Sequence, residues 1–99
     1  MTIKDYEAAV SKGGQPPEGL SPLLRALWLD RQGDWDTAHR ITQDIDGADA
    51  AWVHAYLHRK GGDQENARYW YRQAGRRESA EALQVEWSAI AEHLLSTSS

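Results

Sequence analysis

The chain has 99 residues and a mass of 11.1 kDa, a length that fits a single domain. Its apolar fraction of 40% and charged fraction of 26% are typical of a folded globular protein and not of a disordered one. The absence of cysteine excludes disulfides, thiolate nucleophiles and cysteine-ligated metal sites, and a formal net charge of −4 disfavours general nucleic-acid binding.

No apolar run reaches the roughly 18 residues that cross a bilayer, and the N-terminus lacks the apolar core of a signal peptide. We therefore expect a cytoplasmic protein without a membrane segment. The aromatic residues are five Trp and four Tyr with no Phe, so every aromatic ring carries a polar group. Such usage is typical of rings at wet surfaces and interfaces.

Residues 1–19 are expected to form an N-terminal segment distinct from the rest. Ile3, Tyr6 and Val10 recur at helical spacing, which predicts a short helix over residues 2–11. Residues 12–19 are rich in glycine and proline, so we expect a linker there.

Residues 20–95 are expected to form a helical domain. Ser21 and Pro22 give the first helix an N-cap and a proline at its first position, and glycine breaks separate the helices that follow. The predicted helices span residues 22–31, 34–45, 49–60, 63–74 and 78–95, and residues 96–99 are expected to be a disordered tail. Since no segment alternates with the period of a strand, the predicted fold class is all-α.

An internal repeat organises this domain. Gly33-Asp34 recurs as Gly62-Asp63, 29 positions later. Two alanines recur at the same shift, in the pairs Ala26–Ala55 and Ala38–Ala67. Each copy reads as a helix, a glycine break, an aspartate cap and a second helix, which predicts antiparallel hairpins that stack to share a core.

The segments 33–38 and 62–67 resemble tetratricopeptide repeats, which combine a small residue in the first helix with Gly-Asp at the turn and alanine four positions after the aspartate. The resemblance covers residues 21–75, and Tyr71 and Ala74 match later positions of the second repeat. It implies a tetratricopeptide-like stack of two helical hairpins closed by a C-terminal capping helix.

The same resemblance implies a partner-binding groove, because the first helices of successive hairpins line a concave face in that family. The implied groove positions are Leu23, Leu27, Asp30 and Arg31 in the first copy and Trp52, Tyr56, Arg59 and Lys60 in the second. Two aromatic rings beside two cations suit an apolar side chain next to a carboxylate. The leading prediction is a non-catalytic module that binds a protein or peptide through Leu27, Arg31, Trp52, Tyr56, Arg59 and Lys60. The alternative that Trp52 and Tyr56 pack against the N-terminal segment or the last helix stays open.

Three histidines suggest a second function. His54 and His58 lie four positions apart, on one face of a predicted helix, and His39 on the preceding helix could add a third imidazole. These residues form the alternative ligand site, for a small molecule or a metal ion. A competing interpretation is that His54 and His58 are core residues hydrogen-bonded between helices, since the resemblance places them at core positions.

No other motif points to catalysis. The chain has no phosphate-cradling glycine loop, and no nucleophile can be matched to a base and a carboxylate, so we expect neither enzyme activity nor a cofactor. Arg68, Arg72 and Arg76 form one basic helix edge, interpreted as a solvated face that the acids Glu78, Glu81 and Glu86 balance, with phosphate or an acidic partner as the alternative. Exposed stack ends leave a homodimer possible.

Overall fold

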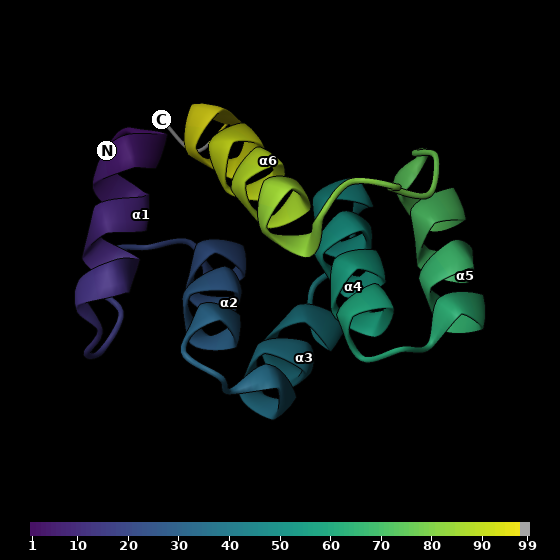
Figure 1. Cartoon of the computed structure of the whole chain (residues 1–99), viewed down its shortest axis with the longest axis horizontal. Coiled ribbons are helices and arrows are strands. Elements are labelled where there is room, and N and C mark those ends of the chain that lie inside the picture. Colours follow the sequence, from purple (N-terminus) through teal and green to yellow (C-terminus); the bar gives the residue numbers. More distant parts are fainter. Residues whose placement is uncertain (98–99) are drawn as a thin grey trace.

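The computed structural model describes residues 1–97, and all regular structure within them is helical. The predicted all-α class is therefore confirmed. The helices are α1 (Ile3–Lys12), α2 (Pro22–Arg31), α3 (Trp35–Gln43), α4 (Ala48–Lys60), α5 (Gln64–Ala74) and α6 (Leu83–Thr97) (Figure 1). None of the helices described combines the length and apolar character needed to cross a membrane.

The helix starts follow the capping signals in the sequence. The Ser21 hydroxyl accepts a hydrogen bond from the Leu24 N–H, and Pro22 opens α2. The first helix starts with a capping box, in which Thr2 and Asp5 each accept a hydrogen bond from the other's backbone N–H. Both devices satisfy N–H groups that have no partner inside the helix, so they fix where each helix begins.

The two Gly-Asp turns have the same local geometry. Gly33 and Gly62 adopt positive φ values of 93° and 84°, a region that residues with a Cβ rarely occupy. The N–H of Asp34 donates to the Leu29 carbonyl oxygen and the N–H of Asp63 to that of His58, each over 2.9 Å. The recurrence in the sequence thus encodes two equivalent helix–helix turns.

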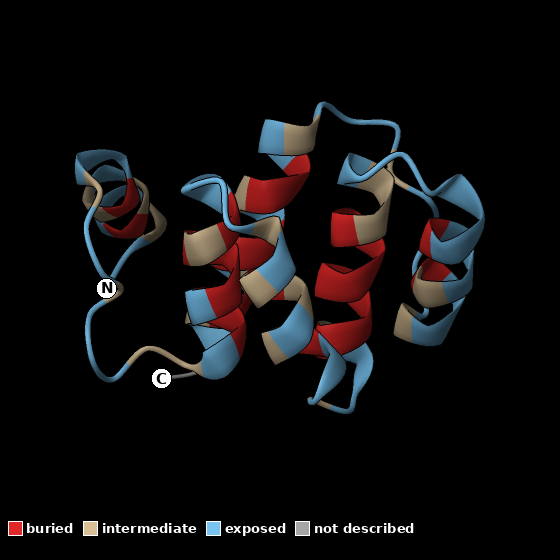
Figure 2. Cartoon of the chain, turned by 90° about the horizontal axis from the view of Figure 1, so that it is seen from below, coloured by how far each residue is buried: buried red, intermediate tan, exposed pale blue. Residues whose placement is uncertain are grey.

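The helices are arranged as neighbouring pairs with one helix laid across them. In Figure 1, α2 lies beside α3 and α4 beside α5, while α6 crosses the ends of this row and contacts α1, α2 and α4. The burial pattern in Figure 2 shows that α4 is buried along most of its length, whereas α5 buries one side only. The central position of α4 puts its side chains in contact with most of the molecule.

The N-terminal segment is docked onto this core. Tyr6 is fully buried, stacks on Trp87 with ring centroids 5.5 Å apart, and donates its hydroxyl to the Leu24 carbonyl oxygen over 2.5 Å. The Gly/Pro-rich linker is held as well, because the Trp28 indole N–H donates to the Gly14 carbonyl oxygen. Burying a large side chain such as that of Tyr6 stabilises a fold by about 2–3 kcal/mol.

The last helix starts later and runs further than expected. It begins at Leu83 instead of residue 78, and Ser96 and Thr97, assigned to a disordered tail from the sequence, continue it. Gly75 ends α5 in the left-handed conformation, and the Arg59 guanidinium donates to the Glu81 carbonyl oxygen. The segment between α5 and α6 is thus tied to α4 by a tertiary contact. The rest of the predicted tail, residues 98–99, lies outside the described residues.

Candidate functional site

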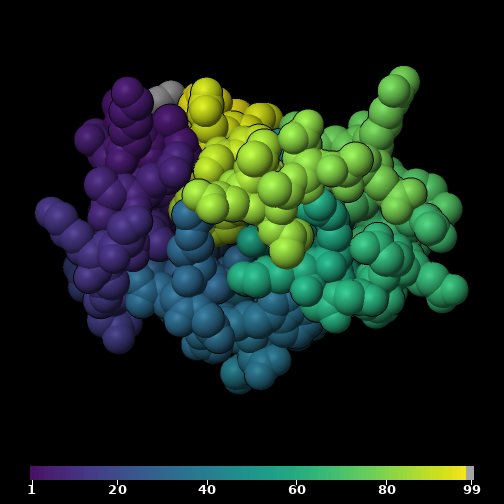
Figure 3. Space-filling view, in the orientation of Figure 1, coloured from purple at the N-terminus to yellow at the C-terminus, as the bar shows by residue number. Residues whose placement is uncertain are grey.

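Helix α6 covers the face that was predicted to bind a partner. Leu27, Trp52 and Tyr56 are buried, and the Trp87 indole N–H of α6 donates to the Leu27 carbonyl oxygen over 3.0 Å. The Arg31 guanidinium lies 4.1 Å from the centroid of the Trp87 ring. Figure 3 shows α6, in yellow-green, covering the region between α1 and α4. For Trp52 the structure therefore shows the alternative arrangement, packing against the last helix.

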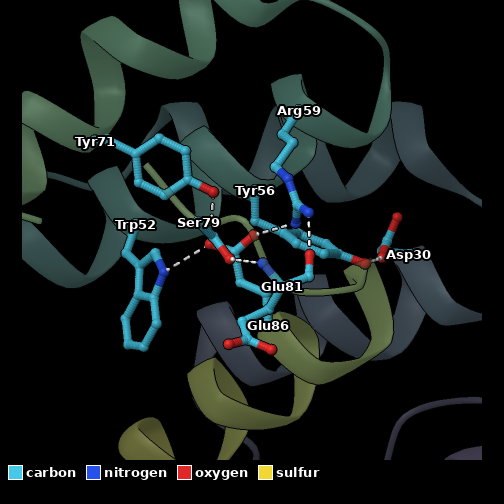
Figure 4. Close-up of polar contacts among 8 residues, drawn as sticks. All are labelled: Asp30, Trp52, Tyr56, Arg59, Tyr71, Ser79, Glu81 and Glu86. Carbon is cyan, nitrogen blue, oxygen red and sulfur yellow. Dashed lines mark hydrogen bonds and ion pairs between the residues drawn. The ribbon is translucent and has the colours of Figure 1, made fainter. Parts of the chain in front are cut away.

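A buried carboxylate holds α6 on α4 and α5. Glu86 is only 3% exposed; its Oε2 accepts hydrogen bonds from Trp52 Nε1 at 3.1 Å and from the Tyr71 hydroxyl at 2.6 Å. Its Oε1 accepts from Arg59 Nη1 at 2.9 Å (Figure 4). Glu86 was expected to help balance the basic edge formed by Arg68, Arg72 and Arg76, but it is buried and pairs with Arg59 instead. The sequence already indicated this burial, because Glu86 stands three positions after Leu83 and so lies on the apolar side of the helix.

Asp30 is a second buried acid with its partners on α4. Its Oδ2 accepts from the Tyr56 hydroxyl at 2.9 Å and its Oδ1 from Lys60 Nζ at 3.0 Å. Burial, together with the neighbouring carboxylates, raises the pKa of Tyr56 and of Tyr71 well above the ordinary value. Both hydroxyls therefore stay protonated and donate to the acids, and the polar groups of this face are satisfied inside the chain.

The three histidines converge where α3 packs against α4. The Nε2 atoms of His39 and His54 are 3.0 Å apart. The rings of His54 and His58 stack at 4.9 Å, and the His39 ring stands edge-on to both, at 4.8 Å and 5.2 Å. One nitrogen from each residue lies within 4.8 Å of the other two. The i, i+4 spacing on α4 and the packing of α3 against α4 together produce this arrangement.

Two tryptophans hold the imidazole planes. The Trp35 ring stacks on His39 at 4.9 Å, and its indole N–H donates to the Leu57 carbonyl oxygen over 2.8 Å. On the other side, Trp70 of α5 stacks on His54 at 4.0 Å with an interplanar angle of 12°. These indoles were not linked to the histidines from the sequence, although the spacing of Trp35 and His39 already puts them on one helix face.

The surroundings keep His54 and His58 in the neutral form that can bind a cation. His54 is 6% exposed, and burial, followed by repulsion from His39 and His58, lowers its pKa from 6.5 to about 4. Burial and then His39 also lower the pKa of His58, against the opposing attraction of Asp63. A neutral imidazole has a free lone pair, so these two residues are in their metal-binding form at neutral pH.

The distances nearly match those of a metal site. Nitrogens about 2.0–2.1 Å from a tetrahedral ion are about 3.4 Å apart, so a ring displacement on the order of 1 Å would bring the three nitrogens onto one ion. A cavity of about 410 Å³, bounded by His54, Trp70 and Gln73 among others, opens beside the cluster. Of the three imidazoles, the cavity is lined by that of His54.

The remaining surface features are ordinary. Tyr69 is 45% exposed while Tyr71 is buried. Arg68 of the basic edge pairs with Glu78 at 3.2 Å, and the Arg76 guanidinium covers the Trp52 ring at 3.4 Å. Two of the three arginines on this edge are thus engaged within the chain.

Comparison with known proteins adds no relative from which a role could be transferred. No protein-family model matches the chain, and neither a curated protein nor a solved structure shows significant similarity to it.

Proposed function

We propose that this protein binds a divalent late transition-metal ion through His39, His54 and His58. The proposal rests on one observation, the convergence of three imidazole nitrogens from two helices within 4.8 Å. Imidazole suits Zn²⁺, Cu²⁺ and Ni²⁺ better than Mg²⁺ or Ca²⁺, which prefer oxygen ligands. We therefore expect selectivity for the first group.

Preorganisation supports the proposal. The stacks of Trp35 on His39 and of Trp70 on His54 restrict ring rotation, so little side-chain entropy remains to be lost on binding. The lowered pKa of His54 keeps protons from competing for that ring until the pH is close to 4. With three protein ligands, a tetrahedral ion keeps one position for water or a small ligand.

A calorimetric titration of the metal-free protein with Zn²⁺ tests the proposal. We expect one ion to bind per chain. The Zn²⁺ affinity of His58→Ala should be at least about 100-fold lower, because a chelating ligand is lost. Cu²⁺ should quench tryptophan fluorescence, because Trp35 and Trp70 stack directly on the ligands.

The fourth histidine provides the matched control. His93 lies on α6, away from the cluster, where it contacts Asp49 at 2.8 Å. His93→Ala should bind Zn²⁺ as the wild type does. If Zn²⁺ does not bind, or if His58→Ala and His93→Ala bind equally well, the three histidines are core residues whose hydrogen bonds serve packing alone.

Protein or peptide binding through a tetratricopeptide-like groove is the second candidate. The position of α6 favours it. This helix lies across α2 and α4, and its Glu86 carboxylate is bound by Trp52 and Arg59. A helix of a partner protein that carries a carboxylate would bind in the same way. Under this proposal α6 leaves the groove without global unfolding, so its amides should exchange hydrogen much faster than those of α4. Equal protection of the two helices would contradict it.

A further inference from the structure

Asp63 stands where the helix turn meets the histidine cluster. Its Oδ1 accepts the Asn66 backbone N–H at 3.3 Å and so caps α5. Its Oδ2 accepts the Asn66 side-chain amide at 2.6 Å and lies 4.0 Å from Nδ1 of His58. One carboxylate therefore lies both at the start of a helix and near the Nδ1 nitrogen of a proposed metal ligand.

We infer that Asp63 is a positioning residue for the metal site, holding the proton of His58 on Nδ1 so that Nε2 presents its lone pair to the ion. The inference rests on the proposed function. An imidazole that binds a metal through one nitrogen usually donates its other N–H to a carboxylate or carbonyl, which fixes the tautomer and makes the ring a stronger ligand. In this cluster, Asp63 is the carboxylate within ion-pair distance of a ligand histidine.

The charge of Asp63 acts in the required direction. Its hydrogen bonds with Asn66 lower the pKa of the carboxyl group, so it is an anion at neutral pH. Burial and the repulsion from His39 lower the pKa of His58, whereas the attraction of Asp63 raises it. Binding of a cation at Nε2 makes the Nδ1 proton more acidic, which strengthens its interaction with a nearby carboxylate.

The first turn shows what this arrangement looks like without a histidine. Asp34 has nearly the same backbone conformation as Asp63 and caps α3 by accepting the Thr37 N–H at 3.2 Å. The residue five positions earlier is Leu29 in the first turn and His58 in the second, and the cap's N–H bonds its carbonyl oxygen in both. The capping role is therefore shared by the two turns, while the contact with an imidazole belongs to Asp63.

This pair of turns supplies a matched experiment. Asp63→Asn and Asp34→Asn both keep a good N-cap residue, so both should keep the wild-type fold and closely similar thermal stability. Zn²⁺ affinity should fall about 10–100-fold in Asp63→Asn, the usual effect of losing such an outer partner, and should not change in Asp34→Asn.

A spectroscopic readout separates positioning from stability. In the Zn²⁺-bound wild type, nitrogen chemical shifts should report His58 protonated on Nδ1 alone, and in Asp63→Asn the spectrum of bound Co²⁺ should change while the helical circular dichroism does not. Wild-type affinity and tautomer in Asp63→Asn overturn the inference but leave the proposed function standing. Failure of the wild-type protein to bind Zn²⁺ overturns both.

Discussion

His39 and His54 face each other nitrogen to nitrogen, with their Nε2 atoms 3.0 Å apart. At that separation one ring donates a proton and the other accepts it, so the pair as arranged holds a single proton between the two Nε2 atoms. A second proton in this position would turn two N–H groups toward each other and break the hydrogen bond between the rings. The relationship links the stability of the fold to pH.

The metal-free protein should lose stability as the pH falls from 6.5 to about 4. In this window the unfolded chain protonates His54, whose ordinary pKa is 6.5, while the folded chain does not until about 4, so acid favours the unfolded state. The loss should reach about 3 kcal/mol and vanish above pH 6.5. Urea denaturation of the wild type and of His54→Gln across this range measures it.

In His54→Gln the part of the pH dependence that comes from the imidazole should disappear, leaving the shallower slope of the remaining titrating groups. Parallel curves for the two proteins would contradict the assignment of the acid sensitivity to His54.

Glu86→Gln should destabilise the protein by about 3 kcal/mol. Whichever way the glutamine amide is turned, its NH2 group faces a donor: Arg59 at one oxygen position, or Trp52 and Tyr71 at the other. The substitution also removes the anion that pairs with Arg59. Thermal or chemical denaturation checks the size of the loss. The control is Glu92→Gln on the exposed side of the same helix, which should change stability by less than about 0.5 kcal/mol. Equal effects of the two substitutions would contradict the role of Glu86.

Two adjacent glycines should respond differently to alanine. Gly62→Ala should lower stability by about 1–2 kcal/mol, because φ at Gly62 is +84° and a Cβ is strained in that region. Gly61 has φ −77° and room for a Cβ at ordinary contact distance from Trp35. Gly61→Ala should therefore be neutral or slightly stabilising. Denaturation midpoints of the two variants decide the matter, and a reversed order would show that the turn geometry is different.

The local architecture could be predicted from the sequence because its signals act over a few residues. Ser21-Pro22 starts a helix, and Gly33-Asp34 and Gly62-Asp63 each end one helix and cap the next. A cap bonds an N–H three positions away, so the order of residues alone specifies it. The pairing of His54 with His58 has the same origin, since a spacing of four puts both rings on one face.

The tertiary structure decided which faces are covered and which side chains meet. Whether Trp52 and Tyr56 would face a partner or the chain itself depended on where α6 lies, and the anchoring of α6 by Glu86 joins residues 34 positions apart. The meeting of His39 with His54 likewise depends on how α3 packs against α4. Such contacts result from helix orientation and from the burial of the whole apolar surface, and no short stretch of sequence contains that information.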